Sequence, residues 1–136
     1  MDKNGIIVVT NGIPLGILLA EKGIKTYCTG GEIISNSHGY AGSFAQNFVK
    51  GFNFDFCFFS CYALGNDGAI SDTSVEENLV RAEAIKNSKT TVFLCDASKF
   101  KMTAPYNLMN VNDTDYVITD ADVVLKKVDK KKFLRV

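Results

Sequence analysis

The chain has 136 residues, 46% of them hydrophobic, and its 15 basic residues balance 15 acidic ones. This length and composition predict one globular domain with its own core and exclude a disordered chain. No apolar run is long enough to span a bilayer, and the first residues lack the apolar stretch of a secretion signal, so we expect a cytoplasmic protein without membrane contact.

The four cysteines indicate buried structural thiols rather than a metal site or a set of disulfides. Three of them lie within or at the end of apolar runs, and no two form a C-x-x-C pair. His38 is the only histidine, so a set of four zinc ligands is not expected. We therefore expect no bound metal ion.

Positive charge is concentrated near the C-terminus of the chain. Residues 122–136 hold six basic and two acidic residues, which gives this segment +4 and leaves −4 for the rest of the chain. Two interpretations remain open for this segment: a solvated helix end, which we favour, and a surface that contacts DNA.

The first part of the chain predicts a β-α-β unit followed by a loop and a short helix. Residues 6–10 and 24–28 are apolar and β-prone, and a proline and spaced leucines between them predict a helix that stops near Gly23. The crossover between the two strands should be right-handed. Residues 32–41 show no period and are expected to form a loop, and residues 42–50 a short helix.

The remainder of the chain predicts three more buried strands and a long helix. Apolar or aromatic runs over residues 54–60, 91–95 and 116–119 are typical of strands in a parallel sheet. Residues 75–87 carry the apolar stripe of a helix. This alternation predicts an α/β fold, with a mostly parallel sheet and helices on both faces.

Four further segments carry weaker signals. Residues 61–72 are polar and contain glycine, and they are expected to form a loop. Residues 102–112 are expected to form a loop that contains a short element of unassigned type. Residues 122–127 are expected to be helical, and residues 133–136 to form a final edge strand. No internal repeat or linker marks a second domain.

Polar residues follow the strands at their carboxyl ends, which is where open α/β sheets bind ligands. We expect them to converge on one edge, because parallel strands end on the same side. The candidate ligand-binding residues supply an amide, flexible backbone, carboxylates and cations: Asn11, Gly30, Gly31, Glu77, Arg81, Asp96 and Lys99. Backbone N–H groups and lysine suit a phosphate, and carboxylates suit hydroxyls. The set therefore predicts a small anionic ligand such as a phosphorylated sugar.

Several of these residues also have a simpler structural explanation. Gly30 and Gly31 suit a tight turn, Glu77 suits a capping box with Ser74, and Lys99 suits an exposed position after a turn. The sequence contains no nucleophile–histidine pair, P-loop or dinucleotide fingerprint, so no cofactor is expected. The residues alone support a ligand-binding domain and do not decide between a sensor and an enzyme.

Several short motifs span residues 7–120 in a specific order and spacing. They are Val9-Thr10-Asn11, Thr29-Gly30-Gly31-Glu32 with Ser37 and Gly42, Phe54-Asp55 before Cys57-Phe58-Phe59, Gly68, Glu77 with Arg81, Asp96-Ala97-Ser98-Lys99-Phe100, and Tyr116-Val117-Ile118-Thr119-Asp120. Together they resemble the C-terminal sensor domain of DeoR-type transcriptional regulators of sugar metabolism.

This resemblance implies a fold related to ribose-5-phosphate isomerase and a role in a cytoplasmic bacterial repressor. A phosphorylated sugar would bind the domain and release the repressor from DNA. The domain would contact DNA only through an N-terminal helix-turn-helix, would need no cofactor and would not be an enzyme. We also expect a homo-oligomer. The alternatives are a small sugar-phosphate isomerase, with Glu77 as base and Lys99 as electrostatic stabiliser, and a pure assembly module.

The sequence departs from the family pattern in three respects. The family's helix-turn-helix and its first strand, helix and phosphate loop have no counterpart here, so we expect residues 1–136 to be a partial effector-sensing domain. Ser60-Cys61-Tyr62-Ala63-Leu64 stands where the family has glycine and an Ala-Asp-Gly run. The related isomerases place acidic residues in that loop, and their absence here disfavours isomerase chemistry.

Overall fold

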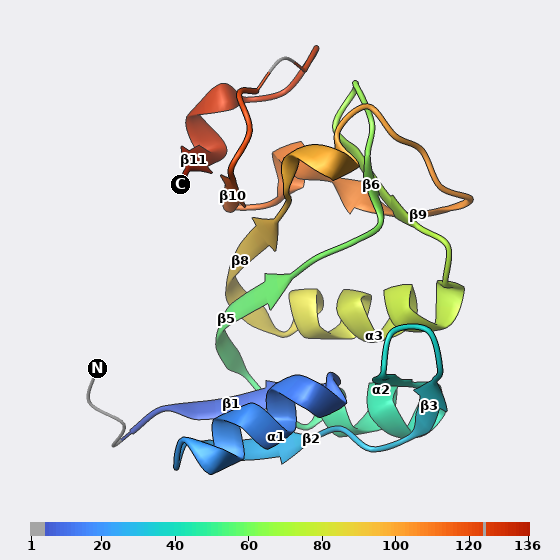
Figure 1. The fold of residues 1–136 in the computed structure, drawn as a ribbon, viewed down its shortest axis with the longest axis vertical. Helices are drawn as coiled ribbons and strands as arrows, with labels where there is room; N and C mark the ends of the chain where they lie inside the picture. Colours follow the sequence, from blue (N-terminus) through green and yellow to red (C-terminus); the bar gives the residue numbers. More distant parts are fainter. Residues whose placement is uncertain (1–4, 124) are drawn as a thin grey trace. The chain divides into compact units, whose positions relative to one another are not determined.

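The computed structural model describes residues 5–123 and 125–136. Contacts within the chain divide it into two compact units, Met1–Phe52 and Asn53–Val136. Figure 1 shows the elements of both units in sequence colours. No helix of the described residues is long and apolar enough to cross a membrane.

The first unit begins with the expected β-α-β arrangement. Strand β1 (Ile7–Thr10) and strand β2 (Lys25–Cys28) pair in parallel, and helix α1 (Ile13–Glu21) connects them. The helix has a proline in its first turn, where no intrahelical N–H bond is lost. Gly23 follows the helix with a φ of +73°, a left-handed conformation that glycine adopts without strain. The three predicted elements are confirmed.

A β-hairpin occupies the segment expected to be a loop. Strand β3 (Glu32–Ile34) pairs antiparallel with strand β4 (Gly39–Ala41), and helix α2 (Ser43–Lys50) follows. The hairpin is held by long-range backbone bonds, because the N–H of Tyr40 donates to the carbonyl of Asn11 at 2.7 Å. The loop prediction was wrong because three-residue strands are too short to show a period.

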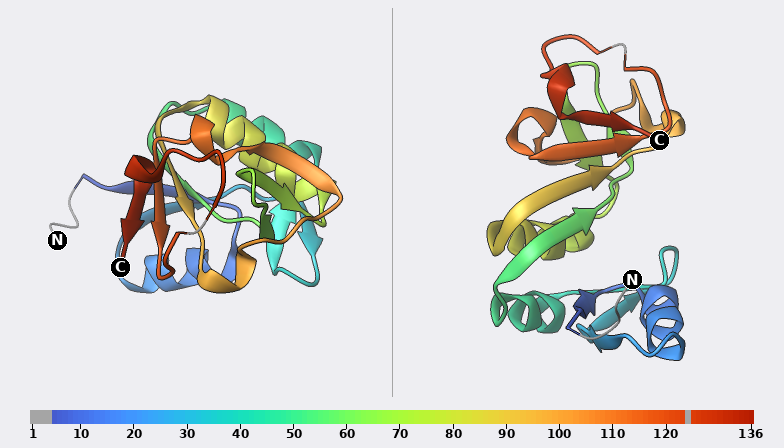
Figure 2. Two further views of the ribbon diagram at one scale, coloured as in Figure 1. Left: turned by 90° about the horizontal axis from the view of Figure 1, so that it is seen from above. Right: turned by 90° about the vertical axis from the view of Figure 1, so that its left-hand side faces the viewer.

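The second unit contains a parallel sheet of four strands in the order β11-β10-β8-β5 (Figure 2). Its members are β5 (Phe54–Phe59), β8 (Ser88–Leu94), β10 (Tyr116–Thr119) and β11 (Phe133–Arg135). Helix α3 (Val75–Lys86) directly precedes β8 in the chain and contacts both β5 and β8. The predicted strands, the long helix and the α/β class are confirmed, and β11 is the expected edge strand.

A small antiparallel sheet stands where two loops were expected. It consists of β6 (Ala63–Leu64), β7 (Ala69–Asp72) and β9 (Tyr106–Asn110). These strands carry polar residues that are satisfied by tertiary hydrogen bonds, which a local pattern does not reveal. For example, the buried hydroxyl of Ser71 accepts from the N–H of Ala104 at 2.9 Å.

The helix expected over residues 122–127 is not formed by the residues described there, while residue 124 lies outside the described part. The described residues of the second unit contain three short 3₁₀ helices: η1 (Ala97–Lys99), η2 (Val111–Asp113) and η3 (Lys130–Lys132). The described residues of this segment, 122–123 and 125–127, lie in the chain between β10 and η3 and form no helix or strand.

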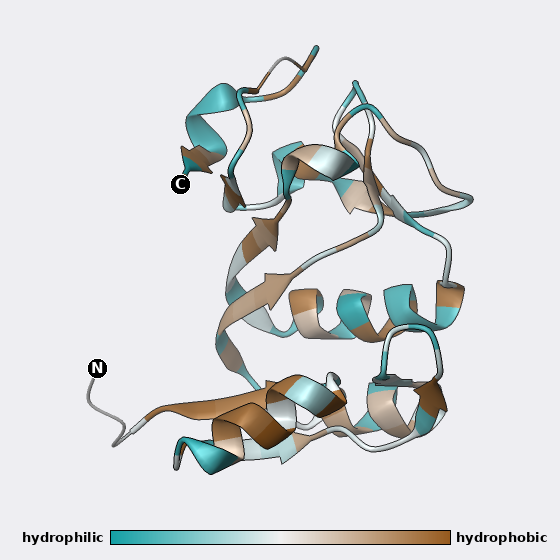
Figure 3. Ribbon diagram, viewed as in Figure 1, coloured by the Kyte–Doolittle hydropathy of each residue, from teal (hydrophilic) through white to brown (hydrophobic). Residues whose placement is uncertain are grey.

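The hydrophobic core of the second unit lies on one face of its parallel sheet. Its buried members are Phe59, Cys61, Leu64, Ile70, Phe93, Cys95, Val111, Val117 and Leu125. Figure 3 shows most of β5 and the second half of β8 as hydrophobic, and apolar side chains also lie on the face opposite the core. On that face the side chains of Phe56 and Phe58 are 59% and 60% exposed.

Candidate functional site

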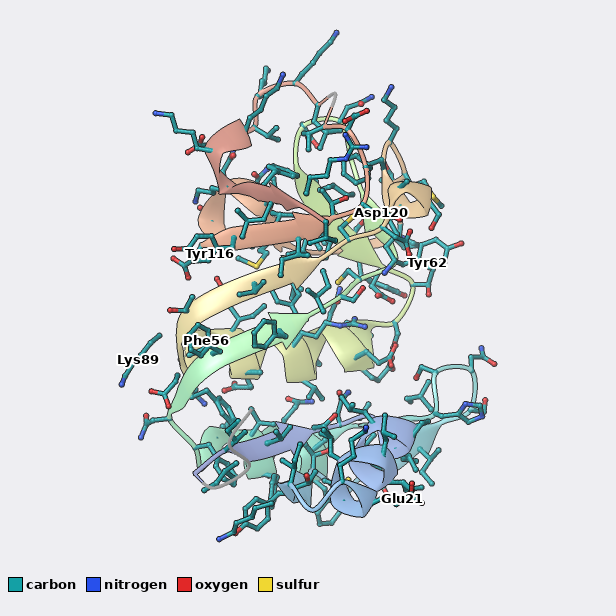
Figure 4. The ribbon with its side chains drawn as sticks, turned by 60° about the vertical axis from the view of Figure 1, so that its left-hand side comes forward. Glu21, Phe56, Tyr62, Lys89, Tyr116 and Asp120 are labelled. Atoms are coloured by element: carbon teal, nitrogen blue, oxygen red, sulfur yellow. The ribbon has the colours of Figure 1, made fainter. Side chains whose placement is uncertain are left out.

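The carboxyl ends of three parallel strands meet in the second unit. Ser60 follows β5, Asp96 lies just after β8, and Asp120 follows β10. The backbone N–H of Ala97 donates to Asp120 Oδ1 at 2.9 Å, which ties the second and third of these ends together. In Figure 4, Tyr62 and Asp120 lie toward this end of the strands, and Lys89 lies at the opposite end. The parallel sheet thus gathers these polar residues as the sequence predicted.

Lys99 reaches across this edge from β8 to β5. Helix η1 turns the chain after β8, so that the half-buried Lys99 ammonium donates to the Ser60 hydroxyl. Asp96 begins that turn, because its Oδ1 accepts from the N–H of Ser98 at 2.9 Å and from the Ser98 hydroxyl. The bond from the Ser98 hydroxyl lowers the pKa of Asp96. The exposed Asp96 therefore carries a full negative charge beside a fixed lysine.

Glu77 and Arg81 lie in a second charged cluster on α3. Arg81 Nη1 donates to Asp72 Oδ2 and to Asn78 Oδ1, both at 3.0 Å, while Glu77 lies 3.9 Å from the guanidinium. Glu77 also donates its backbone N–H to the Ser74 hydroxyl at 3.2 Å. Ser74 is thus an N-cap, but its own N–H donates to Asp72 instead of Glu77, so the expected capping box is only half formed.

Asp72 is the residue that organises this cluster, and the sequence analysis missed it. Its carboxylate is only 6% exposed and accepts from Arg81, from the N–H of Tyr62 at 3.1 Å and from the N–H of Ser74 at 3.1 Å. It stands in a segment that was expected to be a loop. Its position two residues before an N-cap serine was a signal that a carboxylate there would bond to the helix start.

Buried thiols lie between the two clusters. Burial raises the pKa of Cys61 to about 11 and that of Cys95 to about 12. The Cys61 thiol donates to Asn78 Oδ1 at 3.7 Å, and the same oxygen accepts from Arg81, so this thiol lies beside the cluster on α3. Cys61 and Cys95 are therefore protonated structural residues, as expected. The convergence of Glu77 and Arg81 with Asp96 and Lys99 at one ligand site stays a prediction.

The remaining cysteines differ from this pair. Cys57 is half-buried, and burial also raises its pKa. Cys28 is exposed at the end of β2, so the expectation of burial was wrong there. A two-stranded sheet leaves the outward side of each strand open to solvent, which an apolar run in the sequence does not reveal.

The other three candidate residues belong to the first unit. The Asn11 amide donates to the Tyr40 carbonyl at 3.1 Å, which holds the hairpin beside β1. Gly30 and Gly31 have φ values of +67° and +114°, and a Cβ on Gly31 would lie 2.6 Å from the carbonyl oxygen of Ala41. The glycine pair is thus required by the backbone.

The glycine pair lines an open hollow of about 960 Å³ together with the start of α2. This hollow is within the size range of small-molecule sites. Gly42 and Ser43 bring the free N–H groups of the helix start to the hollow, and the first turn carries no acidic residue. Asn11 does not line this hollow. The convergence of Asn11, Gly30 and Gly31 with Lys99 at one edge of the sheet stays a prediction.

An α/β domain with polar groups at the carboxyl edge of a parallel sheet is typical of ligand-binding proteins. The family model described as the DeoR C-terminal sensor domain matches residues 1–121, and the chain belongs to this family. The resemblance seen in the sequence is confirmed.

The curated relatives are transcriptional regulators, and several of them are named repressors. The chain is 25% identical over 122 residues to the glycerol-3-phosphate regulon repressor of Escherichia coli (strain K12), which covers 89% of this chain and 48% of that protein. It is 28% identical over 114 residues to the HTH-type transcriptional repressor GlcR of Bacillus subtilis (strain 168). This match covers 83% of the present chain and 44% of GlcR. The chain thus spans about half the length of these relatives.

Proposed function

We propose that this chain is the part of a cytoplasmic DeoR-type repressor that binds a phosphorylated sugar and thereby controls DNA binding by the rest of the repressor. The observation that carries the proposal is the position of Lys99 at the carboxyl edge of the parallel sheet. There, Lys99 is held beside the Ser60 hydroxyl, and the charged Asp96 lies three residues away. An ammonium group binds phosphate as a point charge, and a carboxylate accepts hydrogen bonds from sugar hydroxyls.

Arg81 is a weaker candidate for the phosphate group. Its guanidinium already donates to Asp72 and Asn78 and lies near Glu77. A ligand would have to displace these partners, whereas Lys99 has only a neutral hydroxyl to give up. We therefore assign the phosphate contact to Lys99 and a supporting role to Arg81.

The same contacts disfavour the isomerase alternative. A catalytic base must be free to take a proton from the substrate. Glu77 lies in the first turn of α3 with its carboxylate 12% exposed and 3.9 Å from the Arg81 guanidinium. The second acid of this cluster, Asp72, is likewise engaged, because it accepts from Arg81 and from the N–H groups of Tyr62 and Ser74. The relatives named above are repressors, which supports a regulatory role.

Isothermal titration calorimetry with a panel of sugar phosphates and their unphosphorylated parents tests the proposal. We expect binding that requires the phosphate. Lys99→Ala should weaken binding roughly tenfold to a hundredfold, since a hydrogen bond to a charged group contributes about 1.5–3 kcal/mol. Lys101→Ala removes an exposed lysine two residues away and should leave the affinity unchanged. No binding by the unmodified chain, or equal affinity in the Lys99 variant, would refute the proposal.

A further inference from the structure

The C-terminal region contains a lysine-rich loop that the proposed sugar site does not use. We define the lysine loop as residues 125–132, which contain five lysines. Four of them, Lys126, Lys127, Lys130 and Lys131, are exposed. Figure 3 shows helix η3 in this region as hydrophilic.

The backbone of the lysine loop is fixed by the core and by Asn112. Leu125 is 6% exposed, and Val128 packs against the same hydrophobic cluster. The Asn112 side chain holds the loop from both directions, because its amide donates to the Lys127 carbonyl and its oxygen accepts from the N–H of Asp129, each at 2.9 Å. The loop is therefore a shaped surface rather than the solvated helix end that the sequence favoured.

The fifth lysine has a structural role. The Lys132 ammonium donates to the backbone carbonyls of Asn112 and Thr114, the latter at 2.6 Å. Asp129 caps η3 by accepting from the N–H of Lys131 at 3.1 Å. The loop thus uses Lys132 and Asp129 to hold its own shape.

The four exposed ammonium groups remain available to a partner. Within the described ranges, the ion pairs of this unit engage Arg81, Lys89 and Arg135, and none engages these four lysines. Lys126 and Lys127 precede the anchor at Val128, and Lys130 and Lys131 follow it, so two pairs of cations flank one fixed point. Four unpaired positive charges on a fixed backbone suit a polyanion.

We propose that the lysine loop contacts the phosphate backbone of double-stranded DNA. This contact would add to the N-terminal helix-turn-helix, through which alone the family resemblance implied DNA binding. Residues 122–136 carry +4 while the rest of the chain carries −4, so this loop is the surface at which a polyanion is attracted to the chain. DNA is the polyanion that HTH-type repressors such as the relatives bind. Lysines that contact phosphates add affinity without reading sequence. The inference rests on the family of the chain and not on the proposed sugar phosphate.

Fluorescence anisotropy with a short labelled duplex of arbitrary sequence tests this proposal. Four phosphate contacts predict that affinity falls about a hundredfold between 50 and 200 mM salt. A variant with Lys126, Lys127, Lys130 and Lys131 changed to Gln should lose at least about tenfold in affinity at low salt and most of the salt dependence. A matched control changes Lys22, Lys86, Lys89 and Lys101 to Gln. It removes the same charge from elsewhere and should bind DNA as the unmodified chain does.

Each other outcome overturns the proposal. Equal DNA binding by the unmodified chain and the lysine-loop variant removes the loop from the contact. An equal loss in the control shows that net charge alone is responsible. Tighter, loop-dependent binding to vesicles rich in anionic phospholipid identifies a membrane surface instead of DNA. Circular dichroism confirms that both variants fold. Calorimetry with the sugar-phosphate panel, run on the same samples, reports separately on the proposed effector site.

Discussion

Asp72 shows how one buried carboxylate can fix several charged neighbours. It accepts from the Arg81 guanidinium and from two backbone N–H groups, those of Tyr62 and Ser74. The residue therefore connects the chain after β5 to the start of α3. Removing it leaves a cation and two donors without their acceptor at a site that is mostly out of solvent.

We expect Asp72→Ala to lower the free energy of unfolding by about 3 kcal/mol, because breaking a buried ion pair leaves an uncompensated charge. Urea denaturation followed by circular dichroism measures this loss. Asp55→Ala is the matched control, since Asp55 pairs with Lys89 at 3.2 Å with both side chains more than three-quarters exposed. It should cost less than about 1 kcal/mol. Equal losses in the two variants would contradict the assigned role of Asp72.

Gly30 and Gly31 both have positive φ values but differ in the space around them. No atom lies within 4 Å of a Cβ built on Gly30, whereas a Cβ on Gly31 would approach the Ala41 carbonyl oxygen to 2.6 Å. We expect Gly30→Ala to cost about 1 kcal/mol of stability from backbone strain alone. Gly31→Ala should cost clearly more, because the hairpin must also move. Thermal melts of both variants test this ranking, and a reversed order would show that the close approach is absent.

The buried thiols predict a loss of stability in alkaline solution. Because burial raises the pKa of Cys61 and Cys95 above that of an exposed thiol, the folded protein holds these protons more tightly than the unfolded chain does. The stabilisation is complete below about pH 9 and is lost as the pH rises toward 11 and 12.

Urea midpoints at about pH 8 and about pH 10 measure this effect. The fall in midpoint should be smaller in a variant with Cys61 and Cys95 changed to Ala. The Cys28→Ala variant, which lacks an exposed thiol, should show the same fall in urea midpoint as the unmodified chain. An identical fall in all three proteins would assign the pH dependence to other groups.

At the scale of elements, the strands that were predictable are those with continuous apolar runs. Strands β5, β8 and β10 lie in a parallel sheet, and their sequences show the apolar composition expected of such strands. The predicted burial of β5 was wrong on one face, because β5 is an edge strand and its Phe56 and Phe58 are mostly exposed. The short strands of the hairpin and of the antiparallel sheet were missed because runs of two to five residues are too short to show a period. The same distinction applies to the site. Chain order places Asp96 and Lys99 at a strand end, but only the folded chain brings Asp72 to Arg81.

Strand β5 presents an apolar surface on the face away from the core. Phe56 and Phe58 stack with their ring centroids 6.0 Å apart, and both are mostly exposed. Parallel sheets are usually covered on both faces. The expected homo-oligomer would cover this apolar face of β5.

We expect the chain to sediment as a species larger than a monomer. A variant with Phe56 and Phe58 changed to Ser should shift toward the monomer, because it removes two apolar side chains from the face without altering the core. Sedimentation velocity at several concentrations measures this shift. Changing Phe44 and Ile17 to Ser removes two exposed apolar side chains in the first unit and serves as the control. A monomer at every concentration would contradict the prediction.

At the scale of the whole molecule, the two units have unequal cores. All nine residues of the main hydrophobic cluster belong to Asn53–Val136. In Met1–Phe52 the buried hydrophobic residues among those described are only Ala41, Ala45 and Val49. The sheets of the first unit have two strands each, and such sheets are marginal in isolation.

We therefore expect a fragment of residues 53–136 to fold by itself and a fragment of residues 1–52 to remain unfolded. The first fragment keeps the four-stranded sheet, α3 and the antiparallel sheet, so it should unfold cooperatively in urea and give dispersed amide signals in NMR spectra. The second fragment would expose Ile7, Leu15 and Ile17, which are already about half exposed in the intact chain. A cooperative transition in the short fragment, or none in the long one, would show that the stability of the chain is not concentrated in its second unit.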